Sequence, residues 1–151
     1  MKKVKLYIDG KEIITSRGST VLEAALSNGI YIPNLCHHPD LKPSGNCRMC
    51  IVEIEGRKGQ VISCMTEVEE GMVVRTESQE ISLVRQTTLE LLHANHTQDC
   101  TNCHSNNTCK LQEVTAFVGV DEDRLSRLRR SRPEIPVDDS NPFSLLIIIN
   151  A

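Results

Sequence analysis

The chain has 151 residues, a formal net charge of −3 and 25% charged residues, enough for one domain or two small ones and without a general nucleic-acid signature. With no Trp, two Phe and two Tyr, its core must be mostly aliphatic. Seven cysteines, an odd number, cannot all form disulfides within one chain. Because no apolar signal region follows Met1 and no apolar run approaches about 18 residues, we expect no membrane span and a cytoplasmic, reducing compartment.

The first 30 residues have the pattern of a hairpin followed by a helix. Residues 4–8 alternate between apolar and polar side chains, which predicts a half-buried strand. Asp9-Gly10 then predicts a tight turn, and residues 12–15 predict the returning strand. The capping box Thr20-x-x-Glu23 predicts the start of a helix, and Asn28-Gly29 predicts its end.

Four cysteines follow, with gaps of ten, two and thirteen residues: Cys36, Cys47, Cys50 and Cys64. A cluster of two irons and two sulfides needs four thiolates, so this stretch predicts a 2Fe–2S binding loop. Gly45 and Pro43 suit a loop that turns sharply and brings amide donors close to sulfur. Structural zinc also takes four thiolates but usually from two close pairs, and only Cys47 and Cys50 are close here. Disulfides are the other alternative, which a reducing compartment disfavours.

Short apolar runs after the cysteine pair predict further strands at residues 51–54, 61–62 and 72–76, with a turn at 55–59. A hairpin, a helix, a cysteine loop and more strands, in this order, make a small mixed sheet with a helix across one face. This is the β-grasp pattern of ferredoxins.

From Ser78 onwards the apolar period becomes helical. Apolar residues and a threonine at spacings of three and four predict an amphipathic helix of about four turns that ends near Asn95: Ile81, Val84, Thr88, Leu91 and Leu92. A second short helix is predicted at residues 109–118, closed by Gly119.

A second set of candidate ligands lies between these helices, with gaps of three, two and five residues: His96, Cys100, Cys103 and Cys109. A four-iron cluster needs four ligands, and His96 can supply the fourth beside the three remaining cysteines. One His and three Cys is also a common ligand set for structural zinc, and the spacing alone leaves both interpretations open. The other histidines are expected to be surface residues: His37, His38, His93 and His104.

Both ligand sets occur in the order found in a family that this chain resembles from about Lys3 to Phe143. The resemblance is carried by the strings Asn34-Leu-Cys-His-His-Pro, Gly45-Asn-Cys-Arg-Met-Cys-Ile-Val-Glu and Ala94-Asn-His-x3-Cys-x2-Cys. The family is the amino-terminal module shared by the large iron–sulfur subunit of respiratory complex I, iron-only hydrogenases and alpha subunits of NAD-linked formate dehydrogenases. It implies a 2Fe–2S cluster on a ferredoxin-like β-grasp fold, held by the first set, and a 4Fe–4S cluster with one His ligand, held by the second. Plant-type ferredoxins differ, because their first gap is four residues.

Together these patterns and the resemblance predict an α+β chain in three parts. Residues 1–77 form a 2Fe–2S ferredoxin-like β-grasp domain, residues 78–120 a small helical His/Cys3 4Fe–4S domain, and residues 121–151 a tail that contacts a partner. In the family, the stretch resembling Val137–Phe143 leads to two further clusters, but residues 144–151 contain no cysteine. A standalone subunit and a shortened form of a longer one both remain open.

The tail combines arginines with an apolar run. For the arginines, a solvated helix end is the commoner interpretation and a docking surface the alternative: Arg124, Arg127, Arg129, Arg130 and Arg132. No nucleic-acid recognition module accompanies them. The run Leu145–Ile149 is too short to span a membrane and could pair as a strand with the chain itself or with a partner.

We therefore expect an electron-transfer subunit of a multisubunit NAD(P)H-linked oxidoreductase: a hydrogenase, formate dehydrogenase, transhydrogenase or complex I-like enzyme, with electron-bifurcating complexes included. The sequence contains no dinucleotide fingerprint and no molybdenum or hydrogen-activating site, so we expect no catalytic residue in this chain. The implied partners are a flavin- or NAD(P)-binding subunit, other iron–sulfur subunits and a ferredoxin. The alternatives are a freely diffusing two-cluster ferredoxin and a zinc-bound interaction module without a redox role.

Overall fold

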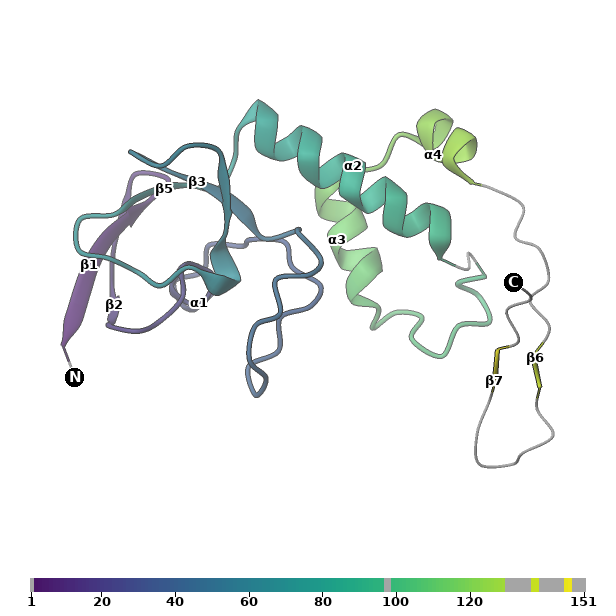
Figure 1. Ribbon diagram of the computed structural model, residues 1–151, viewed down its shortest axis with the longest axis horizontal. Helices are drawn as coiled ribbons and strands as arrows, with labels where there is room; N and C mark the ends of the chain where they lie inside the picture. Colours follow the sequence, from purple (N-terminus) through teal and green to yellow (C-terminus); the bar gives the residue numbers. More distant parts are fainter. Residues whose placement is uncertain (1, 97–98, 130–136, 139–145, 148–151) are drawn as a thin grey trace.

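A computed structural model describes residues 2–96, 99–129, 137–138 and 146–147. A small sheet forms the N-terminal end of the molecule, and the long helix α2 (Gln79–Asn95) leads from it to two shorter helices (Figure 1). Within the described residues no helix is both long and apolar enough to cross a membrane.

Five strands of the described part form one mixed sheet in the order β2-β1-β5-β3-β4. β1 and β5 pair in parallel and the other neighbours are antiparallel, as the mixed-sheet prediction requires. The strands are β1 (Lys3–Ile8), β2 (Lys11–Ser16), β3 (Ile51–Ile54), β4 (Gln60–Ile62) and β5 (Val73–Arg75). The predicted α+β class with a ferredoxin-like sheet is confirmed.

The turn between β1 and β2 also ties the hairpin to the end of β5. Asp9 and Gly10 have φ values of 49° and 78°, the left-handed conformation that a tight hairpin turn requires. The Asp9 carboxylate accepts hydrogen bonds from the Thr76 amide at 2.8 Å and from its hydroxyl at 2.6 Å. The chain is thereby fixed immediately before it enters α2.

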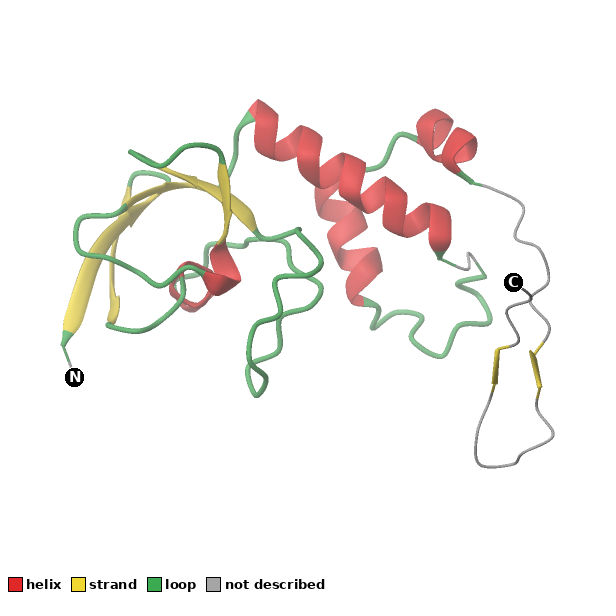
Figure 2. Ribbon diagram, viewed as in Figure 1, coloured by secondary structure: helices red, strands yellow, loops and turns green. Residues whose placement is uncertain are grey.

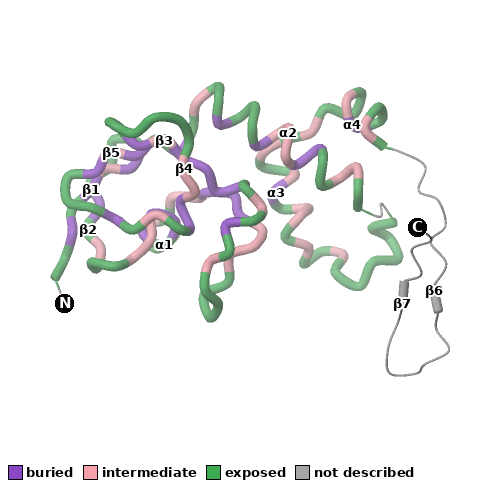
Figure 3. Tube along the Cα trace, viewed as in Figure 1, coloured by how far each residue is buried: buried purple, intermediate pink, exposed green. Residues whose placement is uncertain are grey.

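Helix α1 (Val21–Ser27) begins with the predicted capping box. The Thr20 hydroxyl accepts a hydrogen bond from the Glu23 amide at 3.2 Å, and the Glu23 carboxylate accepts one from the Thr20 amide at 2.8 Å. Figure 3 shows buried segments in α1 and in the strands of the sheet. The buried side of α1 packs with the sheet in a single aliphatic core, whose fully buried members include Leu6, Ile8, Val21, Leu22, Ala25, Val52 and Val74. We expect this core to supply most of the stability of the sheet region.

The buried face of α2 differs from the one that its apolar spacing suggests. Val84, Leu91 and Leu92 are exposed, and the helix instead buries Ile81, Arg85, Leu89 and Glu90. Of the five residues in the predicted stripe, only Ile81 is buried, so the stripe predicts most of the core-facing side wrongly. The physical reason is that both buried charges have partners inside the protein, as buried charges require.

Helices α3 (Lys110–Val118) and α4 (Glu122–Leu128) cover α2. Gly119 ends α3 with φ 77°, as predicted. Glu90 joins α2 to α4: Oε1 accepts a hydrogen bond from the Asp121 amide at 3.2 Å, and Oε2 lies 3.2 Å from Arg124 Nη2. Arg124 is thus paired with a buried carboxylate, although 37% of its side chain remains exposed.

Little of the tail beyond α4 is described. Arg127 and Arg129 are exposed, whereas Arg130 and Arg132 lie outside the described residues. Strand β6 (Val137–Asp138) pairs antiparallel with β7 (Leu146–Ile147), so part of the apolar run pairs within the chain itself. The remainder of that run also lies outside the described residues.

Candidate metal centres

The first four cysteines gather where the loop after α1 meets the β3–β4 hairpin. Cys50 immediately precedes β3, and Cys64 lies in the short turn η1 (Ser63–Met65) after β4; each is 1% exposed. The Ser63 amide donates to the Cys50 carbonyl at 3.0 Å, which holds the two segments together. Cys36 and Cys47 come from the long loop and are half-buried. The structure therefore brings together all four residues of the first predicted set.

These four thiols lie close enough to change one another's ionisation. Burial raises the pKa of Cys64, and the neighbouring thiolates of Cys50, Cys36 and Cys47 raise it further, to about 12. Burial also raises the pKa of Cys47. Four thiolates can share this place only around a positive centre, and iron supplies that charge. The donor set therefore fits a cluster with four thiolate ligands.

Cys36 differs from Cys47 and Cys64 in the direction of its pKa shift. Burial raises its pKa, but hydrogen bonding to the backbone of Cys47 and Asn46 and to the Ser44 hydroxyl outweighs burial and lowers the pKa to about 7. Such donors stabilise a thiolate and would also stabilise the negative charge of a cluster. The sequence argument for amide donors near sulfur therefore has a counterpart in the structure.

Gly45 is the position where the loop depends most on the absence of a side chain. Its φ is 64°, and a Cβ there would overlap Met65 Sδ and lie 3.3 Å from Met65 Cγ. Because Met65 is 56% exposed, its side chain can shift at modest cost, so Gly45→Ala should combine backbone strain with a displaced Met65 and lower the free energy of unfolding by about 2 kcal/mol. It should also reduce the iron bound per chain. Chemical denaturation and iron analysis measure the two effects.

Gly56 provides the matched control, since its φ is 80° but a Cβ would meet no atom within 4 Å. Gly56→Ala should cost about 1 kcal/mol from backbone strain and leave the iron content unchanged. Equal losses of iron in both variants would show that the contact with Met65 does not matter.

The second ligand set lies at the facing ends of α2 and α3. His96 is the residue immediately after α2, and Cys109 immediately precedes α3. In the described part of the loop between them, residues 99–108 (Figure 2), the Cys103 amide donates to the Cys100 carbonyl at 3.3 Å. His96, Cys100 and Cys109 line a cavity of about 230 Å³ that α4 also borders. Cys103 is exposed and does not line that cavity.

His93 is a further member of this cavity that the sequence argument missed. It was expected on the surface, yet it is half-buried one turn before His96, and its Nε2 lies 2.6 Å from the Thr115 hydroxyl. Burial lowers its pKa, and the nearby His96 adds to that effect. His38 and His104 are exposed as expected, and His37 is half-buried with Nδ1 lacking a hydrogen-bond partner.

Across residues 2–96 and 99–129, no three His, Cys, Asp or Glu side chains are grouped closely enough to bind one metal ion. The ligands of a cluster bind different irons and therefore stand farther apart than the ligands of one ion.

A shared core joins the two ligand loops. Met49, from the first loop, packs with Leu89 of α2 and Val114 of α3, and Cys47 lies against this group. Tyr31 extends the contact, with its ring 4.8 Å from that of Phe117 in an edge-to-face arrangement. Leu89 and His96 are about two helical turns, or roughly 10 Å, apart along α2. The first loop therefore contacts α2 close to the end that carries the second ligand set.

Comparison with known families agrees with this geometry. Residues 1–79 match the family model described as the 2Fe-2S iron-sulfur cluster binding domain. The chain belongs to this family. Residues 85–124 match the NADH-ubiquinone oxidoreductase-G iron-sulfur binding region. The resemblance found in the sequence is confirmed, and both parts of this iron–sulfur protein belong to regions described as binding such clusters.

Individual relatives carry the module within much longer chains. The iron–sulfur protein is 41% identical over 128 residues to an NADH-quinone oxidoreductase subunit of Rickettsia typhi, covering 85% of this chain and 19% of that protein. It is 37% identical over 142 residues to the alpha subunit of the NADPH-Fe(3+) oxidoreductase of Geobacter sulfurreducens, covering 92% and 17% respectively. The chain thus spans less than a fifth of the length of these curated relatives.

A solved structure shares the arrangement of nearly the whole chain. A chain of the NAD+-reducing [NiFe]-hydrogenase in its H2-reduced state superposes with a TM-score of 0.77 at 35% identity. The match covers 92% of the iron–sulfur protein and 57% of the hydrogenase chain. The similarity therefore includes the helical part as well as the sheet.

Proposed function

We propose that this chain relays single electrons within a multisubunit NAD(P)H-linked oxidoreductase, using one 2Fe–2S and one 4Fe–4S cluster. The proposed ligands are Cys36, Cys47, Cys50 and Cys64 for the first cluster and His96, Cys100, Cys103 and Cys109 for the second. The observation that carries this proposal is the contact of the first ligand loop with α2, close to the residue that opens the second set. Two one-electron carriers in neighbouring, packed ligand loops suit the transfer of electrons from one cluster to the other rather than chemistry on a substrate.

The residues between the loops have two roles in this account. The side chains of Met49, Leu89 and Val114 are fully buried, so they keep water out of the space between the ligand sets. Close packing also fixes the separation of the loops, because a packed core resists small displacements. When bound, the clusters would supply the redox chemistry, and the protein would hold them at a constant distance.

Several exposed apolar side chains along α2 favour a subunit over a freely diffusing ferredoxin. The exposed fractions are 57% for Leu83, 38% for Val84, 50% for Leu91 and 38% for Leu92. Val84 and Leu91 lie on the same side of the helix, and exposed apolar groups that lie together commonly mark a protein–protein contact. The proposed partners are a flavin- or NAD(P)-binding subunit and other iron–sulfur subunits, as the names of the relatives suggest.

We also propose a cytoplasmic location for this chain. All seven cysteines are free, and eight ligands that include seven thiolates need a reducing environment to persist.

The arginines Arg127 and Arg129 are exposed and remain candidates for contact with a partner subunit.

Anaerobic purification with untagged partners tests the proposed function. The tagged chain should elute together with a flavin-containing protein, and adding NADH or NADPH should bleach the visible absorption of the clusters. The isolated chain should not respond to either nucleotide, because its sequence contains no dinucleotide fingerprint. A fully metallated chain that always elutes alone would contradict the subunit role and favour the free ferredoxin.

A further inference from the structure

A buried arginine connects α2 to the first ligand loop. Arg85 has 2% of its side chain exposed, and its guanidinium points into the loop rather than towards solvent. Its Nε donates to the Met49 carbonyl at 3.0 Å, and its Nη2 donates to the Ile51 carbonyl at 2.8 Å. These two carbonyls belong to the residues on either side of Cys50, which is itself buried. The positive charge therefore lies against the backbone of a proposed ligand.

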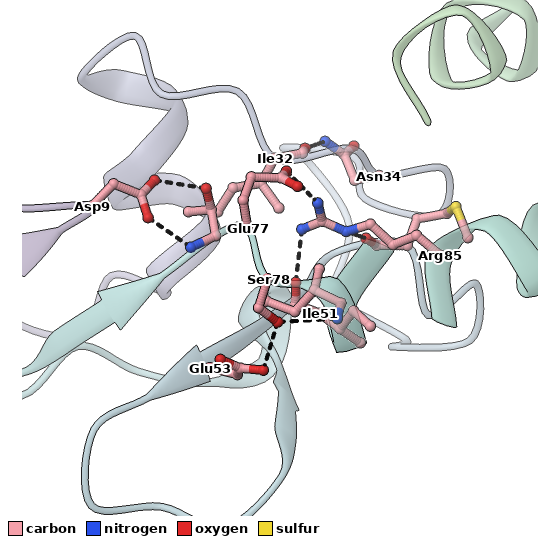
Figure 4. A network of polar contacts seen from close by, with 11 residues as sticks. Asp9, Ile32, Asn34, Ile51, Glu53, Glu77, Ser78 and Arg85 are labelled. Atoms are coloured by element: carbon pink, nitrogen blue, oxygen red, sulfur yellow. Dashed lines mark hydrogen bonds and ion pairs between the residues drawn. The ribbon is translucent and has the colours of Figure 1, made fainter. Parts of the chain in front are cut away.

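The counter-ion of Arg85 is at the opposite side of the guanidinium. Nη1 donates to Glu77 Oε1 at 2.7 Å (Figure 4). The Glu77 side chain is 55% exposed. Water therefore screens the carboxylate, whereas the guanidinium faces the protein interior. Burial lowers the pKa of Arg85, and the Glu77 carboxylate and the Cys50 thiolate oppose that effect. An arginine remains charged under these conditions.

Anchoring alone does not explain why a charge occupies this position. Burying an ion pair is costly, and well-packed apolar residues often stabilise a fold as well or better. A buried charge whose counter-ion is screened does, however, act strongly on any group that gains an electron nearby. The position of the Arg85 charge therefore allows it to influence a nearby redox centre as well as to hold the loop.

We propose that Arg85 is a positioning residue that raises the reduction potential of the 2Fe–2S centre, by holding a buried positive charge beside the backbone of Cys50. This inference rests on the proposed function, because it requires the first ligand set to hold that cluster. The reduced form carries one more negative charge than the oxidised form, so the guanidinium stabilises it more. The same side chain fixes the ligand loop to α2 through its fork of donors, an effect separate from that of its charge.

Three variants separate the charge from the anchoring. Arg85→Gln removes the charge and keeps an amide donor, and it should lower the ratio of reduced to oxidised cluster about tenfold at a fixed potential, or about 59 mV for one electron. Arg85→Lys keeps the charge but loses the fork, so the potential should change by less than half as much while the melting temperature falls. Glu77→Gln removes only the screened counter-charge and should raise the ratio by about twofold.

The measurement is a redox titration of the 2Fe–2S signal by electron paramagnetic resonance, using the full chain alone. Opposite shifts for Arg85→Gln and Glu77→Gln support the proposal, since a loosened structure would not produce opposite signs. Unchanged potentials in all three variants, with lowered melting temperatures, would overturn it and leave only an anchoring role. If Arg85→Gln fails to fold, an unshifted Glu77→Gln still overturns the proposal. A wild-type chain without any 2Fe–2S signal would instead overturn the cluster assignment, and this inference with it.

Discussion

Replacing Cys47 with serine should abolish the 2Fe–2S signal and leave the second centre intact. Cys47 is half-buried among the other three thiols, and a serine hydroxyl is a poor substitute for a thiolate at iron. Loss of a bound metal centre is among the few single changes that cost on the order of 4 kcal/mol of stability. For a chain of this length that cost corresponds to a fall in melting temperature of about 10 °C or more. Electron paramagnetic resonance and calorimetry measure the two effects.

Lys42→Ala is the control for this substitution. Lys42 is exposed in the same loop, so its replacement should change neither the 2Fe–2S signal nor the melting temperature. If Cys47→Ser removed both cluster signals while the protein remained folded, the assignment of two separate ligand sets would be wrong.

His96 is expected to give the second large effect. His96→Ala should leave one iron of the 4Fe–4S cluster without a protein ligand, so the iron content should fall from about six to about five per chain. The oxidised protein should then show the resonance of a three-iron cluster. His96→Cys should keep four irons, but the added thiolate charge should lower the potential by roughly 60 mV or more, which is tenfold in the redox ratio. Iron analysis and a redox titration measure these changes.

The control must be His104 and not His93. His93 lines the same cavity as His96 and hydrogen-bonds with Thr115, so its removal would disturb the site. His104 is exposed in the loop between the helices, and His104→Ala should change neither iron content nor potential. A full 4Fe–4S spectrum with an unchanged potential in His96→Ala would refute the histidine ligand.

Short-range features of the fold could be predicted from the sequence because their causes are local. The capping box of Thr20 and Glu23 and the turn at Asp9-Gly10 each involve residues within a few positions of one another. The position of β5 between β1 and β3 depends on pairs far apart in the chain, so periodicity alone does not predict this strand order.

The buried face of α2 could not be predicted for a related reason. Hydrophobic periodicity assigns charged residues to the solvent side, and nothing near Arg85 or Glu90 in the sequence identifies their distant partners. Those partners are carbonyls of residues 49 and 51, and Arg124. The same limit applies to His93, whose contact with Thr115 comes from the packing of α2 against α3.

The ligand sets were predictable because metal chemistry constrains residue type and spacing more tightly than packing does. The structure gathers the first set completely and places three members of the second around one cavity. The assignment of each residue to its cluster, the one-each cluster count and the domain limits at residues 77 and 120 stay predictions.

Quantifying iron, acid-labile sulfide and zinc in anaerobically purified protein tests the central claim most directly. Two clusters held by eight ligands predict about six irons and about six sulfides per chain, with no zinc. A brown protein with that composition would support the two-cluster relay. About two irons together with about one zinc per chain would contradict it, because the second ligand set would then be a structural zinc site.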